Sequence, residues 1–388
     1  MNKRQLLART AAAMLALAVW SASAQTPDAA AVTRHYANIV SASYEDTLSG
    51  ALDMQRAIRA FVAAPSAETL AAARKSWIAE REWYGQTEAY RFYSGPIDDD
   101  KGPEGRVNSW PLDEAFIDYV KGKPKSGLIN DRKVVISKAS LARYNTRGGE
   151  ENVSVGWHAI EFLLWGQDFR ADGPGERSFE DYIDGKAANA DRRRQYLLAV
   201  TELLIDDLRY LVKAWAPDAR NYRASFERGG IESVRKMIVG MGSLSRGELA
   251  GQRMETAMNT QDQEDEHSCF SDNTNRDIVN NALGVENVWF GRFKRRDGSE
   301  LKGASLNDFI AATDAAVAER TGKQISASVA AARDIRAPFD QEILGGKDAP
   351  GRQRVQKTID SLVQQSKDLV DAASVLGIKR LTLVKPKA

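Results

Sequence analysis

The sequence predicts an all-α protein made of two packed helical-bundle domains. Long stretches without proline carry apolar residues at the three- and four-residue spacing that is typical of helices. Runs of alternating β-branched residues are scarce, and the best of them is the short stretch Val134-Val135-Ile136. A chain of 388 residues, of which 43% are apolar and 28% charged, is long enough for two folded domains.

The first 24 residues have the composition of a secretory signal peptide. A basic end precedes an apolar run over 11–20, and the small residues Ala22-Ser23-Ala24 follow. This pattern predicts cleavage before Gln25. Neither this run nor any later stretch reaches the ~20 apolar residues that a membrane span requires. We therefore expect an exported protein without a transmembrane span.

The mature chain is close to electrical neutrality. Three of the 54 basic residues lie in the first 24 positions, so 51 basic side chains remain against 53 acidic ones. This balance gives no electrostatic argument for binding nucleic acid or an anionic membrane surface. The single cysteine, Cys269, cannot form an internal disulfide and is more typical of a packed apolar residue than of a nucleophile.

Proline and glycine divide the N-terminal half, 25–225, into helices and one irregular stretch. Ser66, which follows Pro65, is a typical helix N-cap. The expected elements are a helix over 28–64, a helix from Ser66 to Ser94, an irregular stretch over 95–150, a helix from Gly156 and a helix over 191–215.

The C-terminal half, 226–388, is predicted to form a second helical domain. The boundary falls between 215 and 230, after Pro217 closes the preceding helix. Helices are expected over 231–242, 246–260, 305–320, 322–336 and 352–375.

The segment GWHAIEFLLWGQD, residues 156–168, places two ionisable side chains in an otherwise apolar helix. His158 and Glu161 are three residues apart and so share one helix face. A helix that is apolar nearly all round is buried, and a buried carboxylate is costly unless it is paired, neutralised or bound to a cation. Three interpretations follow: a protonated His158 bridged to an acid, a neutral or arginine-paired Glu161, or a metal site with both residues as ligands.

Two further segments carry polar residues that could line a site. In 76–98, aromatic and charged residues share one helical stripe, which indicates a polar crevice or an interdomain face with ion pairs. In 261–277, four acids precede His267, and Asp272 and Asp277 follow. Such a cluster could hold a hard or borderline cation, or form a solvated loop.

Together these motifs resemble those of the imelysin family. Gly156, His158 and Glu161 match its G-x-H-x-x-E signature, and the tracts 86–98, 110–113 and 264–272 are similar to further family hallmarks. The resemblance covers most of the mature chain. It implies two packed helical bundles, a site near their interface and a role in bacterial iron acquisition. It also implies a location in the periplasm or at the outer membrane, with an iron-uptake component of either place as a partner.

The resemblance leaves two functions open. In a binding protein for a metal ion or iron compound, His158 and Glu161 would be ligands, with Glu88, Asp98 and Asp113 as weaker candidates, and iron would be preferred to zinc. In the alternative, a metallopeptidase, His158 and Glu161 would be catalytic around zinc, as the family's grouping with peptidases implies. The established motifs H-E-x-x-H and H-x-x-E-H are both absent.

A third interpretation keeps the two residues as a structural pair. His158 and Glu161 would hydrogen-bond inside the core, with Arg81 neutralising the carboxylate. In every case the residues expected to line the pocket are Arg81, Tyr84, Trp110, Trp157, His267 and Asp272.

Overall fold

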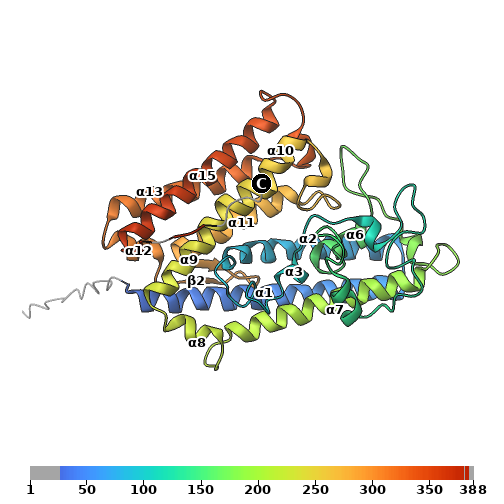
Figure 1. Ribbon diagram of the computed structural model, residues 1–388, viewed down its shortest axis with the longest axis horizontal. Helices are drawn as coiled ribbons and strands as arrows, with labels where there is room; N and C mark the ends of the chain where they lie inside the picture. Colours follow the sequence, from blue (N-terminus) through green and yellow to red (C-terminus); the bar gives the residue numbers. More distant parts are fainter. Residues whose placement is uncertain (1–26, 380, 384–388) are drawn as a thin grey trace, which may run out of the picture.

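The computed structural model describes residues 27–379 and 381–383, and over these residues the chain is almost entirely helical (Figure 1). The predicted all-α class is confirmed. The signal peptide predicted for 1–24 lies outside the described residues. Within them, the only strands are β1 (Arg292–Lys294) and β2 (Glu300–Lys302), which form an antiparallel hairpin. The short β-branched stretch Val134-Val135-Ile136 forms no strand and lies in irregular backbone after a turn.

Four helices form the first bundle, which lies below the second in the view of Figure 1. They are α1 (Ala29–Ala63), α2 (Ala67–Thr87), α6 (Gly156–Trp165) and α7 (Ala190–Trp215). The predicted N-cap is confirmed, because the Ser66 side chain accepts the backbone N–H of Thr69. Short elements connect this bundle: η1 (Glu88–Tyr90), α3 (Glu104–Val107), α4 (Glu114–Ile117), α5 (Lys138–Tyr144), η2 (Phe179–Tyr182) and α8 (Tyr222–Glu227).

The second bundle is built from the C-terminal half of the chain (Figure 1). Its main helices are α9 (Ile231–Ser243), the π-helix η3 (Leu244–Glu255), α11 (Thr274–Phe290), α13 (Ala315–Asp334) and α15 (Pro350–Val375). Its short helices are α10 (Thr256–Thr260), η4 (Gln263–Asp265), α12 (Leu306–Ala311) and α14 (Asp340–Ile343). The exact domain boundary between 215 and 230 stays a prediction.

The structure departs from the predicted helices in several places. The helix predicted from Ser66 to Ser94 ends at Thr87 and continues only as the 3-10 turn η1. The predicted helix over 305–320 is broken after Ala311, because the Asp314 side chain accepts the backbone N–H of Val317 and starts a new helix there. The helix expected over 246–260 is a π-helix as far as Glu255. Helix α11 was missed altogether, since its four asparagines have low helix propensity.

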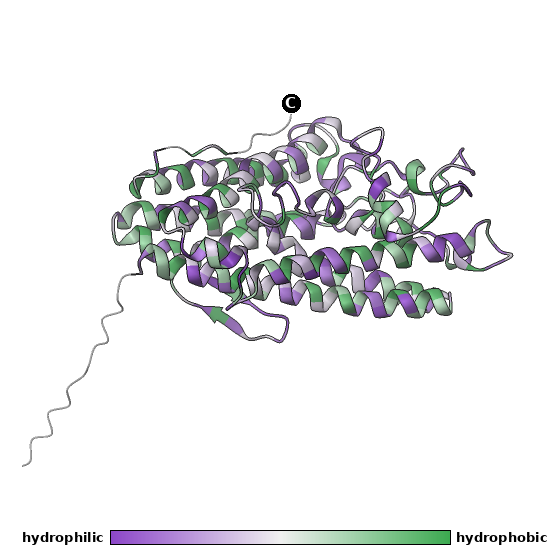
Figure 2. Ribbon diagram, turned by 60° about the horizontal axis from the view of Figure 1, so that its bottom comes forward, coloured by the Kyte–Doolittle hydropathy of each residue, from purple (hydrophilic) through white to green (hydrophobic). Residues whose placement is uncertain are grey.

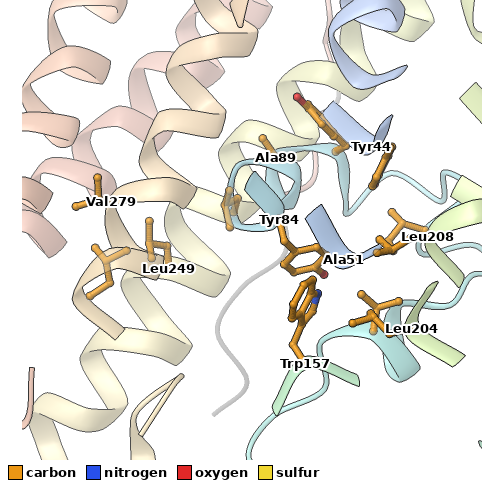
Figure 3. Close-up of a cluster of buried hydrophobic side chains, with 14 of the residues drawn as sticks. Tyr44, Ala51, Tyr84, Ala89, Trp157, Leu204, Leu208, Leu249 and Val279 are labelled. Atoms are coloured by element: carbon orange, nitrogen blue, oxygen red, sulfur yellow. The ribbon is translucent and has the colours of Figure 1, made fainter. Parts of the chain in front are cut away.

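One continuous apolar core joins the two bundles. Figure 2 shows apolar and polar residues alternating around the long helices, the pattern of helices that bury one side. At the junction, Tyr84 of α2 packs against Trp157 of α6, with Leu249 and Val279 of the second bundle nearby (Figure 3). Among the described residues, none of the helices has both the length and the apolar character of a membrane span.

Two glycines allow the bundles to approach closely along α2 and α11. A Cβ atom on Gly284 of α11 would lie 2.3 Å from the backbone oxygen of Gln86, and one on Gly85 would lie 2.8 Å from Cβ of Asn280. Both distances are shorter than real Cβ contacts, so a larger side chain would separate the helices. This close contact brings together residues of α2 and α11 that take part in the candidate site.

Candidate functional site

The glycine of the G-x-H-x-x-E motif starts α6 in a position that only glycine fits. Gly156 has φ +90°, and a Cβ atom there would lie 2.6 Å from the backbone oxygens of Arg106 and Val107. All ten residues of α6 are buried, His158 and Glu161 included. The motif therefore fixes the helix against α3 and carries its two polar side chains into the core.

The histidine and the carboxylate of the motif contact each other directly. Nδ1 of His158 lies 2.8 Å from Oε2 of Glu161. The other carboxyl oxygen, Oε1, accepts the backbone N–H of Ser271 at 3.0 Å and its hydroxyl at 2.6 Å. Both oxygens of Glu161 are thus hydrogen-bonded, one within α6 and one to the segment before α11.

A second histidine faces the first. Nε2 of His158 lies 3.3 Å from Nε2 of His267, and the ring centroids are 4.7 Å apart. Nδ1 of His267 contacts Oδ2 of Asp277 at 2.9 Å. Each imidazole therefore has a carboxyl group at Nδ1 and the other histidine at Nε2. The amide Nδ2 of Asn108 also lies 3.4 Å from Nε2 of His267.

Arg81 closes the far end of this arrangement. Its guanidinium donates to Oδ1 of Asp277 at 3.2 Å and to Oδ2 at 2.8 Å, and also to Oδ1 of Asn108 at 2.7 Å. The third interpretation paired Arg81 with Glu161; the structure pairs it with Asp277. We call the connected side chains Ser271, Glu161, His158, His267, Asp277 and Arg81 the buried polar chain.

Further contacts hold Asp277 and Arg81 in place. Ser268 donates its hydroxyl to Oδ2 of Asp277 at 2.6 Å, and Asn273 donates its amide to Oδ1 at 3.2 Å. The Arg81 guanidinium lies over the rings of Trp77, Tyr84 and Trp157 at 5.3 to 5.8 Å. Two residues predicted to line the pocket, Tyr84 and Trp157, therefore pack behind the buried polar chain.

Burial and neighbouring charges set the protonation states of the buried polar chain. It lowers the pKa of His158 well below the ordinary value and that of His267 to about 4, so both rings are neutral near pH 7. Burial raises the pKa of Glu161 to about 8, although the Ser271 hydroxyl and Arg81 act against it. Burial would also raise the pKa of Asp277, but Arg81 and His267 outweigh it and hold that pKa well below its usual range.

These protonation states allow one consistent direction of hydrogen bonding. Ionised Asp277 accepts Nδ1–H of His267, which leaves Nε2 of His267 as an acceptor. His158 then donates Nε2–H to it and accepts at Nδ1 from the protonated carboxyl of Glu161. If Glu161 ionises, His158 carries its hydrogen at Nδ1, and two bare nitrogens face each other at 3.3 Å. A cation between the rings would stabilise that second arrangement.

The two nitrogens fit a metal ion in separation and in their outer partners. Their distance of 3.3 Å is shorter than twice a zinc–nitrogen bond of ~2.0–2.1 Å, so one ion can contact both. A carboxylate on the opposite ring nitrogen is the usual outer partner of a metal-binding histidine. Over the described residues, however, no three His, Cys, Asp or Glu side chains are grouped to hold an ion. The buried polar chain itself offers an ion two nitrogen donors.

A cleft of about 470 Å³ opens onto His267. The ring of Trp110 lies against His267, with centroids 5.9 Å apart. Asn108 and His267 connect the cleft to the buried polar chain. The cleft is lined by Arg91, Phe92, Glu104, Asn108, Ser109, Trp110, Thr146, Glu150, Glu248, Gln252 and His267.

The three weaker ligand candidates have other partners in the structure. Glu88 accepts the Tyr84 hydroxyl at 2.9 Å and pairs with Arg91 at 2.5 Å and Arg253 at 2.8 Å. Burial would raise its pKa, but the two guanidinium groups lower it to about 2. Asp98 accepts backbone N–H groups in the turn that follows Arg91. Asp113 caps α4.

Asp272 lies in a separate group of acids rather than along the cleft. Burial, followed by the charges of Asp168 and Asp340, raises the pKa of Asp272 to about 7. Burial and the same group raise the pKa of Glu266 well above its ordinary value. These residues come from the loop after α6, the segment before α11 and α14. The group is therefore strained by like charges above neutral pH.

Several site residues could not be found from local sequence patterns. Asn108 and Ser271 sit in loops, and Glu104, Glu248 and Arg253 resemble ordinary surface charges in the sequence. Asp277 was visible in the acidic segment, where it suggested a cation ligand. Its actual partners, His267 and Arg81, could be identified only from the packing of α11 against α2.

Comparison with known proteins gives one family and a consistent fold. The family model described as Imelysin matches residues 40–369. "Iron-regulated protein A" of Synechococcus elongatus is 26% identical over 320 residues, which are 79% of this chain and 75% of that protein.

Two crystal structures resemble most of the chain. One, from Parabacteroides distasonis, is provisionally named an iron-regulated protein A precursor; it has a TM-score of 0.68 at 20% identity and covers 91% of this chain and 97% of its own. The other, an imelysin-like protein from Psychrobacter arcticum, has a TM-score of 0.63 at 13% identity with the same coverage. At these identities the two structures show the fold alone.

Proposed function

The chain belongs to the imelysin family, and we propose that it is an exported protein of bacterial iron acquisition that binds an iron compound between His158 and His267. Its place of action is the periplasm or the outer membrane, where it works with an iron-uptake component. The name of the Synechococcus relative supports the connection to iron. The signal-peptide pattern of the first 24 residues supports export.

The observation that carries the proposal is the pair of facing nitrogens. Nε2 of His158 and Nε2 of His267 are 3.3 Å apart, and each ring has a carboxyl group at Nδ1. When a cation takes the place of the hydrogen between the rings, Glu161 loses its proton and accepts Nδ1–H of His158. Imidazole nitrogen is a ligand that iron accepts. The predicted ligand Glu161 then acts through His158 and orients its ring.

The small number of protein donors favours a complex over a bare ion. Two nitrogens converge here, whereas zinc sites in proteins usually have three or four protein ligands. The remaining positions would be filled by water or by the donor atoms of the cargo itself. The adjoining cleft of about 470 Å³ is within the size range of small-molecule sites. The site is thus suited to an iron compound that keeps part of its own ligand shell.

The metallopeptidase alternative has less support from the same geometry. Catalytic zinc sites use three protein ligands and a water, with a carboxylate base close to that water. Here Glu161 contacts the Nδ1 side of His158 and Ser271, away from the facing Nε2 atoms. The proposal therefore assigns His158 and Glu161 to binding.

Metal retention by untagged protein tests the proposal. Wild type would be incubated with ferrous ion, ferric nitrilotriacetate and zinc, desalted and analysed for bound metal. We expect about one equivalent of iron, lost in His158→Gln and in His267→Gln. The chain offers a matched control in its third histidine, His35, whose Nε2 lies 2.9 Å from the backbone oxygen of Gly291. His35→Gln should retain iron; equal retention by all variants, or none by wild type, contradicts the proposal.

A further inference from the structure

Asn108 links the buried polar chain to the cleft beside His267. It is only 4% exposed, yet it is one of the residues that line the cleft. Asn108 caps the end of α3, where its backbone N–H donates to the carbonyl oxygen of Glu104 at 3.2 Å. Arg106 of the same short helix pairs with Asp207 of α7 at 2.7 Å. The backbone that carries the Asn108 amide is therefore tied to the first bundle.

The direction of the Asn108 amide follows from its partner Arg81. Nη1 of Arg81 lies 2.7 Å from Oδ1 of Asn108. A guanidinium group only donates hydrogen bonds, so the atom that faces it has to be the amide oxygen. The amide nitrogen Nδ2 then faces the other way, 3.4 Å from Nε2 of His267. Arg81 thus fixes a hydrogen-bond donor beside one of the two nitrogens of the proposed iron site.

This donor is weakly used within the protein. A separation of 3.4 Å is long for a hydrogen bond, and the contact involves at most one of the two N–H groups of the amide. Among the described residues, His267 is the only hydrogen-bond partner of Nδ2. In the proposed site an iron compound takes Nε2 of His267. The Asn108 donor is then free for an acceptor on that compound.

Two other residues that line the cleft have N–H groups without an acceptor. Nε of Arg91 and Nε1 of Trp110 are buried and have no hydrogen-bond partner in the described part of the chain. The ring of Trp110 lies against His267, with centroids 5.9 Å apart. Buried donors are costly unless an acceptor is supplied. A compound that brings acceptor oxygens therefore suits these lining residues better than one whose outer atoms are N–H donors.

Resting on the proposed function, we propose that Asn108 determines which iron compounds the site accepts, by donating a hydrogen bond from Nδ2 to an oxygen of the bound compound. The cargo is then an iron chelate with oxygen ligands, such as carboxylate or hydroxamate groups, whose oxygens accept hydrogen bonds. A chelate built from amine ligands presents N–H groups to Nδ2, donor against donor. A site whose buried polar group loses its partner in this way discriminates strongly between similar ligands.

Exchanging the Asn108 amide for a carboxylate tests the proposal on the intact protein. In Asn108→Asp one oxygen can still accept from Arg81, but an acceptor oxygen replaces Nδ2. The affinities for ferric nitrilotriacetate, whose ligands are carboxylates, and for zinc ion would be measured in wild type and variant. We expect the variant to bind the ferric chelate at least about tenfold more weakly. Zinc should bind no more weakly than to wild type, because the added charge attracts a bare cation.

Gln252→Glu is the matched control, because it makes the same amide-to-carboxylate exchange at another lining residue. Its ratio of the two affinities should stay within about threefold of the wild-type ratio. An equal fall of the ratio in both variants would show that the added charge alone is responsible. An equal loss of both probes in Asn108→Asp would show a structural role. Either result overturns the role of Asn108 and leaves the proposed function standing.

A pair of chelates tests wild type directly and does not depend on the folding of a variant. Nickel(II) nitrilotriacetate and nickel(II) tris(2-aminoethyl)amine leave the same positions open for the two imidazoles, but one presents carboxylate oxygens and the other N–H groups. Wild type should bind the nitrilotriacetate complex at least about tenfold more tightly. Equal binding, or tighter binding of the amine complex, overturns the proposal. Absence of binding by every probe, zinc ion included, overturns the proposed function as well.

Discussion

His158 and His267 face each other at 3.3 Å through their Nε2 atoms, although 109 positions separate them in the sequence. One carboxyl group contacts each ring from behind, Glu161 on one side and Asp277 on the other. The two carboxyl groups differ in character. Asp277 is held ionised by Arg81, whereas Glu161 keeps its proton near pH 7. A change of charge on binding is therefore concentrated at Glu161.

Replacing Glu161 by glutamine should preserve the fold but abolish metal retention. The amide oxygen can accept from Ser271, and the amide N–H can donate to Nδ1 of His158, as the protonated carboxyl does. His158 is then fixed with hydrogen on Nε2. We expect a free energy of unfolding within about 1 kcal/mol of wild type. Urea unfolding combined with metal analysis measures both effects.

The contrasting variant is Glu161→Ala, which leaves the buried N–H of Ser271 and the acceptor atom Nδ1 of His158 without partners. Its loss of unfolding free energy should exceed that of the glutamine variant by about 2 kcal/mol or more. A glutamine variant as unstable as the alanine variant would show that Glu161 is ionised in the resting protein.

Metal affinity should rise with pH up to about 8. The pKa of Glu161 is raised to about 8, so below that pH a bound cation must displace a proton, and above it the proton is already lost. The expected increase approaches tenfold for each pH unit between 6 and 8, with a plateau above. Competition against a chelator of known pH dependence measures it, with zinc as the probe. A metal affinity that stays constant between pH 6 and 8 would contradict the displacement of the Glu161 proton by the cation.

Asp277→Asn should destabilise the protein strongly. The substitution leaves the buried Arg81 guanidinium without its counter-charge and weakens the partner of His267. Breaking a buried pair in this way costs about 3–5 kcal/mol. Urea unfolding at pH 7 measures the loss. The exposed pair of Arg59 and Glu202 serves as the control, where Glu202→Gln should cost about 1 kcal/mol or less.

Asp272→Asn should stabilise the protein at alkaline pH. In the folded state the pKa of Asp272 is about 7, well above that of an unfolded aspartate. The folded chain therefore holds more protons between pH 4 and 7, and its stability falls as the pH rises through this range. Asparagine carries no such charge and tolerates the positive φ of 56° at this position.

The free energy of unfolding of Asp272→Asn should exceed that of wild type by about 1 kcal/mol at pH 8. This is less than the full pKa shift would give, because the side chain is partly exposed to solvent. It should shrink toward pH 4. Urea unfolding of the variant and of wild type at pH 4.5 and 8 measures this difference in stability. A difference that does not depend on pH would contradict the explanation.

Gly284→Ala should loosen the contact between α2 and α11. Alanine is the better helix former, but its Cβ would lie 2.3 Å from the backbone oxygen of Gln86, which cannot move aside as a side chain could. We expect a net loss of about 1–3 kcal/mol. Gly346→Ala is the control, because no atom lies within 4 Å of its Cβ position. Equal stability of the two variants would mean that the helices have room to separate.

Local signals predicted both ends of α1 and the start of α2. Asp28, Pro65 and Ser66 act within one turn of the helix they start or stop, so their effect is visible in the sequence. Helix α11 was missed because its stability comes from packing against α2, which outweighs the poor propensity of its asparagines. A pattern that depends on a distant partner carries little local signal.

The same distinction applies to the site. His158 and Glu161 were recognisable because helical spacing relates them directly. His267 was placed near the pocket, but its contact with His158 depends on the fold of the segment before α11. Arg81 was expected to meet Glu161, and only the approach of α2 to α11 gives it Asp277 instead.

The separation of the buried polar chain from the walls of the cleft has an evolutionary consequence. Thr146 and Gln252 line the cleft without a hydrogen bond to Glu161 or Asp277 within the described residues, so substitutions there can change the accepted compound one residue at a time. His158, by contrast, is tied to Glu161 and His267, which have further partners of their own, and a change at either of them disturbs the other. Proteins descended from one ancestor can thus come to accept different compounds in the cleft while they keep the same buried polar chain.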